Sequence, residues 1–203
     1  DRLVCLISGG GSALMSAPLV SMDPDLKMRT HQALLASGAT ISELNTVRKQ
    51  LSLVKGGRLV EACQGQVLNF LVSDVPGDRV EFIASGPTVP AHTNQSDAIE
   101  VLTRYQIGLL DELLPWLSNA DYAMPQPESD CFQRVTTTIV AAPSQSLKQA
   151  QAFLESEGVE CWLLGDSIEG DSVTVARVMA ETALWQRRHR RLERPLCLLS
   201  GGE

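Results

Sequence analysis

The chain has 203 residues, of which 44% are hydrophobic and 20% charged, as expected for one sizeable α/β domain or for parts of two. Its formal net charge of −7, without a Lys/Arg-rich run, argues against nucleic acid as the partner, because a phosphate backbone needs a basic patch. No stretch approaches the roughly 18 consecutive apolar residues of a membrane span, and no signal peptide precedes the first predicted strand. We therefore expect a small-molecule partner and no membrane.

The five cysteines, at positions 5, 63, 131, 161 and 197, form no C-x-x-C pair, and three of them lie in apolar runs. Thiols in such runs behave as small hydrophobes, so we expect them to be reduced in a cytoplasmic protein. The sequence starts almost on a predicted strand and stops just after a Gly-Gly pair. We therefore expect a fragment of a two-domain protein.

Strand and helix patterns alternate along most of the chain. Strands are predicted over 4–7, 67–72, 136–142, 159–165 and 196–200. Helices are predicted over 25–37, 96–105, 109–117, 146–157 and 171–188, with an ordered loop over 83–94 and an exposed connection over 124–130. This alternation predicts a Rossmann-like, mostly parallel sheet with helices on both faces.

A further helix is predicted from its start signal. Thr40 and Glu43 form a T-x-x-E capping box, and apolar residues at three- and four-residue spacing continue until Gly56-Gly57. At about 100° per residue, Asn45, Arg48, Ser52 and Lys55 would share one side of this helix. Arg48 could hold a carboxylate or phosphate, and Lys55 could supply a mobile positive charge to a transferring phosphoryl group. An ordinary solvated helix face is the alternative.

Two strands are followed by Ser-Gly-Gly, which exposes bare backbone N–H groups able to approach an anion. The first continues as Gly9-Gly10-Gly11-Ser12, and the second ends in Gly201-Gly202. We predict a phosphate or carboxylate site there, with a ligand-free tight turn as the alternative. The loop is neither a P-loop nor a dinucleotide fingerprint, whose third glycine is replaced by Leu14.

Acidic residues follow the strand over 67–72. Asp74 and Asp78 of "SDVPGD" could hold Mg²⁺ or accept a proton from a substrate hydroxyl, or they could simply form the turn. The three histidines share no ligand spacing, which argues against a zinc site or a Ser-His-Asp triad.

Five strings together give a more specific signal than any one of these motifs. They are "SGGGSAL" (8–14), "NTVRKQLSLVKGGRL" (45–59), "SDVPGDRVEFIASGPTVP" (73–90), "LLGDSIEG" (163–170) and "LLSGGE" (198–203). In this order they resemble the ATP-dependent glycerate 2-kinases of the MOFRL type, which in bacteria are also called hydroxypyruvate reductases. The resemblance implies transfer of the γ-phosphoryl group of ATP to the 2-hydroxyl of D-glycerate, with Mg²⁺.

The resemblance also implies roles for particular residues. Lys55, Asp78 and Arg48 would be catalytic, and Asp74 with Asp78 would hold the metal. Substrate and phosphate would be bound by Gly9, Gly10, Gly11, Ser12, Asn45, Ser85, Gly86, Thr88, Gly201, Gly202 and Glu203. The chain departs from the family pattern at Gln50, Ala91 and Pro143, where His, Asp and Asn are usual.

As domains, the resemblance implies that residues 1–123 belong to the N-terminal α/β region of the kinase. Residues 124–203 would be a βαβαβ segment that leads into an absent MOFRL domain. We expect such a fragment to be inactive alone, and a homodimer is one possible assembly. Two other functions stay open: an NAD(P)H-dependent hydroxypyruvate reductase and a non-catalytic anion-binding module.

Overall fold

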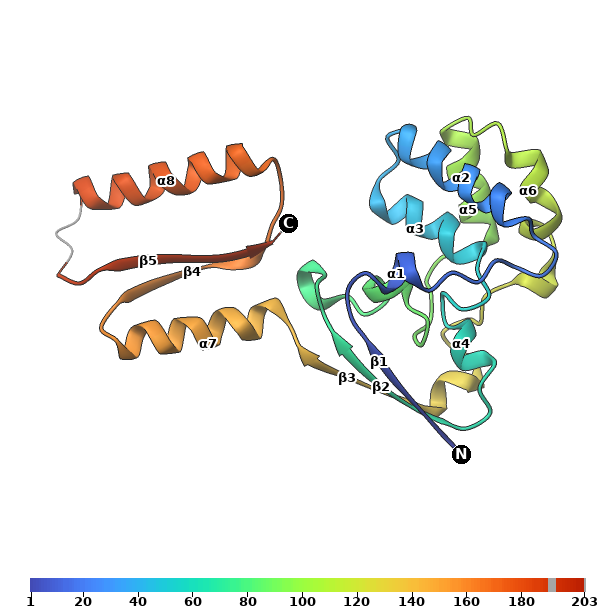
Figure 1. Cartoon of the computed structure of the whole chain (residues 1–203), viewed down its shortest axis with the longest axis horizontal. Coiled ribbons are helices and arrows are strands. Elements are labelled where there is room, and N and C mark those ends of the chain that lie inside the picture. The colour runs from blue at the N-terminus through green and yellow to red at the C-terminus, as the bar shows by residue number, and fades with distance from the viewer. Residues whose placement is uncertain (190–192, 203) are drawn as a thin grey trace. The chain divides into compact units, whose positions relative to one another are not determined.

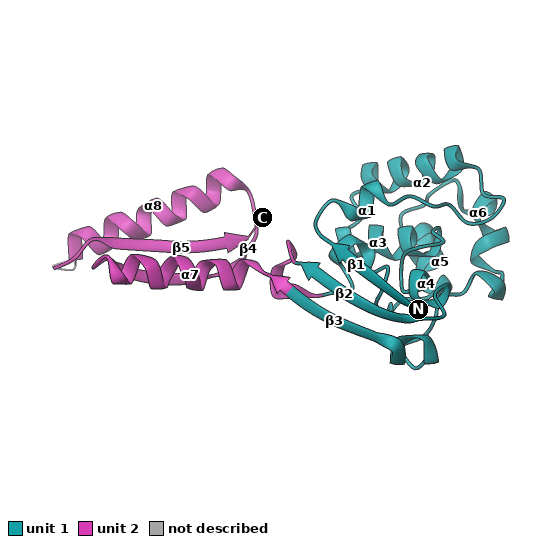
Figure 2. Cartoon of the chain, turned by 60° about the horizontal axis from the view of Figure 1, so that its bottom comes forward, with its two compact units in different colours: residues 1–72, 80–139 teal, residues 73–79, 140–203 magenta. Residues whose placement is uncertain are grey.

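The computed structural model describes residues 1–189 and 193–202, which form two compact units. Unit 1 comprises residues 1–72 and 80–139, and unit 2 comprises residues 73–79 and 140–203 (Figure 2). The expected division at residue 123 concerns the domains of the family and stays a prediction. No helix within the described residues is long and apolar enough to cross a membrane.

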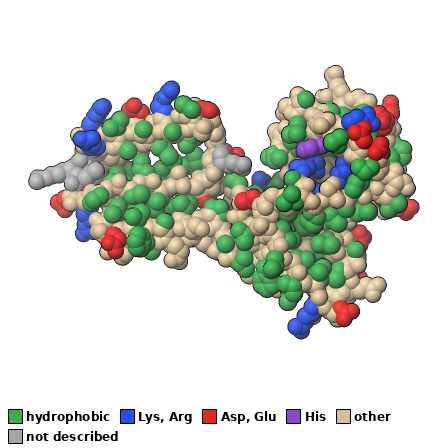
Figure 3. Space-filling model, in the orientation of Figure 1, with side chains coloured by type: hydrophobic (Ala, Val, Ile, Leu, Met, Phe, Trp, Pro, Cys, Tyr) green, Lys and Arg blue, Asp and Glu red, His purple; other side chains and the backbone are tan. Residues whose placement is uncertain are grey.

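The sheet of unit 1 places the glycine turn at a strand end. It has the order β1 (Arg2–Ile7), β2 (Gln66–Val72), β3 (Val135–Ala141), and β1 runs parallel to β2 (Figure 1). One face is buried, where Cys5 and Val67 join a small core with Val60 of α4 (Arg58–Glu61). Hydrophobic side chains gather over the strands in Figure 3, and Val4 and Leu6 of β1 are 55% and 81% exposed.

The larger core of unit 1 lies among helices. They are α2 (Pro24–Ala36), α3 (Ile41–Gln50), α5 (Gln95–Arg104) and α6 (Leu110–Leu117). Leu34, Val47, Leu102 and Leu113 are fully buried among them. Shorter helical segments are α1 (Gly11–Leu14), η2 (Ile83–Ser85), η3 (Ala120–Tyr122) and η4 (Asp130–Arg134). The helices predicted over 25–37, 96–105 and 109–117 are thus confirmed to within two residues at each end.

Helix α3 ends earlier than predicted. Its capping box is confirmed, but the helix stops at Gln50 instead of continuing to Gly56. The reason is Arg58, whose Nη1 donates to the carbonyls of Lys49 at 2.7 Å and Ser52 at 2.6 Å. The Leu53 amide donates to the Ala17 carbonyl at 2.9 Å instead of bonding within a helix. The prediction that Ser52 and Lys55 extend one face of this helix is therefore wrong.

Unit 2 is a strand pair with a helix on either side (Figure 1). Its elements are η1 (Pro76–Asp78), α7 (Pro143–Ser156), β4 (Glu160–Ile168), α8 (Ser172–His189) and β5 (Leu196–Gly202). Pro143 occupies the first turn of α7, where its missing N–H costs nothing. The α/β class with parallel strands is confirmed, although the described strands form two sheets, of three and two strands.

The second Ser-Gly-Gly is part of a strand. Gly201 and Gly202 continue β5, and Gly202 pairs with Ile168 of β4. A Cβ on Gly202 would collide with the Ile168 backbone, so close strand pairing requires glycine there. The prediction that Gly201 and Gly202 form an exposed turn is therefore wrong. Glu203 lies outside the described residues.

We predict that Thr40→Ala lowers the free energy of unfolding by about 1 kcal/mol, the usual cost of losing an N-cap side chain. Thr40 Oγ1 accepts from the Glu43 amide at 3.3 Å and also donates to the Glu43 carboxylate at 2.7 Å. Urea unfolding measures the change. Ser42→Ala, an exposed position in the same turn, is the control and should stay within about 0.5 kcal/mol of wild type. Equal losses in both variants would contradict the assignment.

Candidate functional site

Three segments of unit 1 meet beside α1. They are the glycine loop (residues 9–14), the turn after α3 (51–58) and the segment 83–88. The Gly56 amide donates to the Ser85 carbonyl at 3.1 Å, and the Gly57 amide donates to the Gly86 carbonyl at 2.8 Å. The Ser12 and Ser85 hydroxyls are 2.6 Å apart. The segment 83–88 thus contacts both the glycine loop and the turn after α3.

Two glycines of the glycine loop, Gly10 and Gly11, are explained by the local structure. Gly10 is the N-cap of α1 and has φ 79°, a left-handed conformation that favours glycine. A Cβ on Gly11 would lie 2.8 Å from the Cβ of Ala84, closer than packing allows. These two glycines are therefore required by the fold itself and are not by themselves an argument for an anion.

The segment opposite this loop is strained. Ala84 and Ser85 have φ 52° and 63°, and neither is a glycine. Such left-handed residues cost about 1–3 kcal/mol each and persist only where their surroundings hold them. Ser85 is fully buried and is held by the bonds to Gly56 and Ser12. Strain of this kind concentrates at functional sites, which favours this corner of unit 1 as one.

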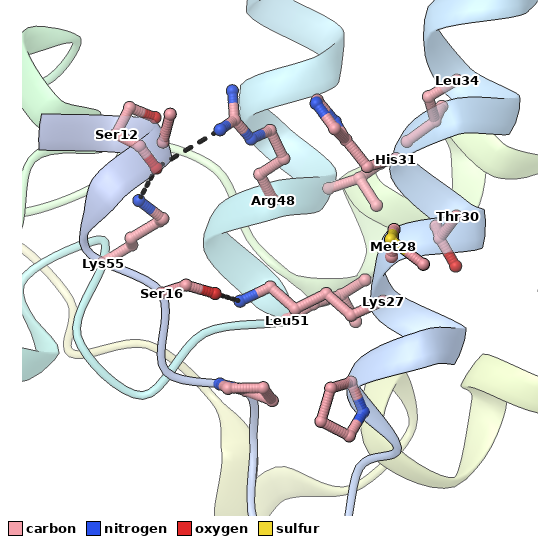
Figure 4. Close-up of a pocket in the computed structure, with 14 residues that line it drawn as sticks. Ser12, Ser16, Lys27, Met28, Thr30, His31, Leu34, Arg48, Leu51 and Lys55 are labelled. Carbon is pink, nitrogen blue, oxygen red and sulfur yellow. Dashed lines mark hydrogen bonds between the residues drawn. The ribbon is translucent and has the colours of Figure 1, made fainter. Parts of the chain in front are cut away.

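Two cations converge on the glycine loop. Lys55 Nζ donates to the Ser12 carbonyl at 2.6 Å, and Arg48 Nη2 donates to the same oxygen at 3.3 Å (Figure 4). Although Lys55 is not on α3, the turn that Arg58 imposes brings it back beside Arg48. The two side chains are therefore neighbours, as the sequence predicted, although Lys55 lies in the turn after α3 and not on the helix; that both contact Ser12 was not predicted.

Ser12, Arg48 and Lys55 line a cavity of about 230 Å³ that α2 closes on the other side. From α2 come Lys27, whose Nζ donates to Ser16 Oγ at 3.4 Å, and His31 (Figure 4). Sequence reasoning missed both residues. The signal was their i, i+4 spacing, which places them on the same face of α2.

Lys27, Arg48 and Lys55 place three positive charges around this cavity. Burial lowers the pKa of Arg48, and it lowers the pKa of Lys27 with a further contribution from Arg48. The pKa of Lys55 is lowered to about 8, mainly by burial and then by repulsion from Arg48 and Lys27. Within the described residues, no carboxylate forms an ion pair with these three groups. A bound anion would relieve the repulsion, so the cavity is suited to an anionic ligand.

Other predicted site residues are buried in unit 1 outside this cavity. Asn45 on α3 and Thr88 are 7% and 1% exposed, and Asn45 Oδ1 has no hydrogen-bond partner. Gln50, where the resembled family has His, donates from Nε2 to the Thr93 carbonyl at 3.5 Å. Their roles in binding a substrate stay predictions.

The predicted metal ligands lie in unit 2. Asp74 is exposed, whereas Asp78 is half-buried in η1 with φ 53°, and its Oδ1 has no hydrogen-bond partner. No cluster of three or more His, Cys, Asp or Glu side chains is found within residues 1–189 and 193–202. A shared site of Asp74 and Asp78 with Lys55 therefore stays a prediction.

Residues 1–118 match the family model described as "Domain of unknown function (DUF4147)". The chain belongs to this family. The expected resemblance to glycerate kinases is confirmed as well. The chain is 40% identical over 180 residues to glycerate kinase of Homo sapiens, covering 87% of this chain and 34% of the relative. It is 42% identical over 205 residues to a putative hydroxypyruvate reductase of Agrobacterium vitis, covering 100% and 46%.

The fold of this DUF4147 chain also matches a solved structure. The crystal structure of glycerate kinase from Thermotoga maritima superposes with a TM-score of 0.86 at 32% identity, covering 100% of this chain and 48% of that one. The chain thus spans about half the length of this kinase, and about a third to a half of the length of the two relatives named above.

We predict that anion binding in the cavity weakens above pH 8. The pKa of Lys55, about 8, lies below its usual value, so this side chain loses its charge as the pH rises from 7 to 9. At pH 9 about one tenth of it is protonated, so affinity for sulfate should fall by up to about tenfold. Sulfate keeps its charge over this range, and calorimetric titration measures its affinity.

Lys55→Arg is the control, because a guanidinium stays charged throughout this range. Its affinity for sulfate should change little between pH 7 and 9. An equal loss of affinity in both proteins would show that Lys55 does not carry the effect.

Proposed function

We propose that this chain is part of an ATP-dependent glycerate 2-kinase, which transfers the γ-phosphoryl group of ATP to the 2-hydroxyl of D-glycerate and yields 2-phosphoglycerate. The observation that carries the proposal is the convergence of Lys55 and Arg48 on the Ser12 carbonyl, at a cavity that no carboxylate of the described residues lines. Relatives named glycerate kinase and, in Thermotoga maritima, D-glycerate 2-kinase support it.

Phosphoryl transfer depends on positioning and on positive charge near the transferred group. The ammonium of Lys55 has three donors and uses one on Ser12, which leaves two for oxygens of a phosphoryl group. Arg48 likewise donates one N–H to the Ser12 carbonyl, and its other guanidinium N–H groups can donate to phosphate oxygens. The Ser12 to Ser85 contact fixes the loop that orients both cations.

Asp74 and Asp78 are the residues that would hold Mg²⁺. The unbonded buried oxygen of Asp78 fits this role, since Mg²⁺ is commonly bound by one or two carboxylates together with substrate phosphates. When bound, the ion would neutralise charge on the phosphate oxygens.

The proposal concerns the full-length gene product, because the chain spans about half of the kinase from Thermotoga maritima. We expect the chain alone to be inactive. The five free cysteines support a cytoplasmic protein. A small-molecule partner and a homodimer are further parts of the proposal.

A second candidate is an NAD(P)H-dependent hydroxypyruvate reductase. The name of the relatives from Agrobacterium vitis favours it. The glycine loop argues against it, since Leu14 stands where a dinucleotide fingerprint needs its third glycine and that loop packs against Ala84.

Two assays separate these functions, one for phosphoryl transfer and one for NADH-dependent reduction of hydroxypyruvate. The full-length gene product is incubated with ATP, Mg²⁺ and D-glycerate, and enolase converts any 2-phosphoglycerate directly. We expect enolase-dependent product without added mutase. NADH oxidation with hydroxypyruvate would favour the reductase, and neither reaction, with the protein folded, would favour an anion-binding module.

We predict that Lys55→Met lowers kcat by about 10²- to 10³-fold, the usual loss when one group that stabilises transition-state charge is removed. Asp78→Asn should also lower kcat and raise the Mg²⁺ concentration required for half-maximal rate. Lys148→Met, at an exposed lysine of α7, is the matched control and should leave kcat unchanged. Near-normal turnover in both the Lys55 and Asp78 variants would refute these roles.

A further inference from the structure

Helix α2 carries two cations, Arg29 and Lys27, which differ in location and in hydrogen-bond partners. Arg29 lies on the surface and forms ion pairs with Asp25 at 3.0 Å and Glu112 at 3.2 Å. Lys27, two residues earlier, lines the cavity and makes one long hydrogen bond, to Ser16 Oγ at 3.4 Å. Arg29 is thus paired with carboxylates, whereas Lys27 forms no ion pair with any carboxylate in the part of the chain that the structure describes. This difference indicates that Lys27 is available to bind an anionic ligand.

His31 lies one turn further along the same face of α2 and also lines the cavity. Its Nδ1 is buried and has no hydrogen-bond partner. Burial and the nearby Arg48 lower the pKa of His31, which favours the neutral ring at pH 7. A neutral imidazole can donate one hydrogen bond from Nδ1 in one of its tautomers. On the α2 side, the cavity is therefore lined by the Lys27 ammonium and by the unpartnered Nδ1 of His31.

The cavity has two polar regions joined by apolar side chains. Figure 4 shows Lys55 and Arg48 meeting at Ser12, while Lys27 reaches from α2 toward Ser16 further along the same chain segment. Leu34, Val47 and Leu51 line the space as well. At about 230 Å³, the cavity is smaller than the roughly 300–1,000 Å³ of sites for drug-sized ligands. Its size suits the small acceptor substrate better than the nucleotide.

We propose that Lys27, assisted by His31, binds the carboxylate of the acceptor substrate and so selects 2-hydroxy acids over neutral polyols. This inference rests on the proposed kinase function and adds the basis of its substrate choice. Lys55 and Arg48, at the Ser12 end, then face the transferred phosphoryl group. A neutral polyol would leave the Lys27 charge half-buried and uncompensated, and the apolar walls would strengthen the attraction to a carboxylate.

The test compares Lys27→Met with Arg29→Met in the full-length gene product. For Lys27→Met we expect the KM for D-glycerate to rise by about 10- to 100-fold, as for the loss of one charged hydrogen bond, while kcat stays within about threefold. The rate with glycerol, which has no carboxylate, should not fall. Arg29→Met should match wild type, because surface ion pairs contribute little.

Two further variants separate binding from folding. Lys27→Arg keeps the charge and should restore a KM for D-glycerate near that of wild type. His31→Phe should raise this KM by a smaller factor than Lys27→Met. If Lys27→Met lowers kcat without changing KM, or if it behaves like Arg29→Met while wild type phosphorylates D-glycerate, the inference is wrong and the kinase function stands.

Calorimetric titration with D-glycerate, in the absence of ATP, keeps the inference testable if wild type shows no phosphoryl transfer. Weaker binding by Lys27→Met than by Arg29→Met would support the carboxylate site even then. Equal affinity in the two variants, or no binding by wild type, would overturn it.

Discussion

The buried guanidinium of Arg58 determines the local structure on which the candidate site depends. It donates to the carbonyls of Lys49, Ser52 and Tyr122, three oxygens that ordinary helical bonding leaves unsatisfied. Burial lowers the pKa of Arg58 to about 10, still far above neutrality, so the group stays charged. This buried charge is tolerated because carbonyl oxygens satisfy its donors, and the nearby Glu61 carboxylate partly offsets the effect of burial on the pKa. The chain therefore turns after Gln50 instead of extending α3.

This turn has consequences for both sides of the site. It directs Lys55 back to the Ser12 carbonyl, next to Arg48 from the last turn of α3. It also presents the amides of Gly56 and Gly57 to the strained segment at Ser85 and Gly86. The strain in that segment and the crowding of cations are thus held by the same few residues.

The sequence allowed the local elements of this site to be predicted where a short-range signal defines them. Thr40 and Glu43 predict the start of α3, because a capping box is formed by two residues that are three apart in the sequence. The strand over 67–72 is recognisable because all of its side chains except Asn69 are apolar. The resemblance to glycerate kinases was also evident in the sequence, because several long strings occur in the family order.

Other features depend on contacts between distant residues and could not be read from a pattern. Apolar spacing predicted that α3 continues to Val54, whereas its end is decided by Arg58 and by Ala17, more than 30 residues from Leu53. Gly201 and Gly202 have the composition of a turn, but the close approach of β4 makes them strand residues. Lys27 was overlooked because a lysine on a helix is usually solvated, and only the fold shows which side of α2 faces the cavity.

The outer face of β1 bears on how this chain behaves when it is produced alone. β1 is an edge strand, and Val4 and Leu6 project from it into solvent. The backbone groups along an edge strand can pair with a strand of another molecule, and exposed hydrophobic side chains beside them favour this pairing. Both features promote intermolecular sheet formation and aggregation. Self-association of the isolated chain would then arise from this exposed strand and not from the candidate site.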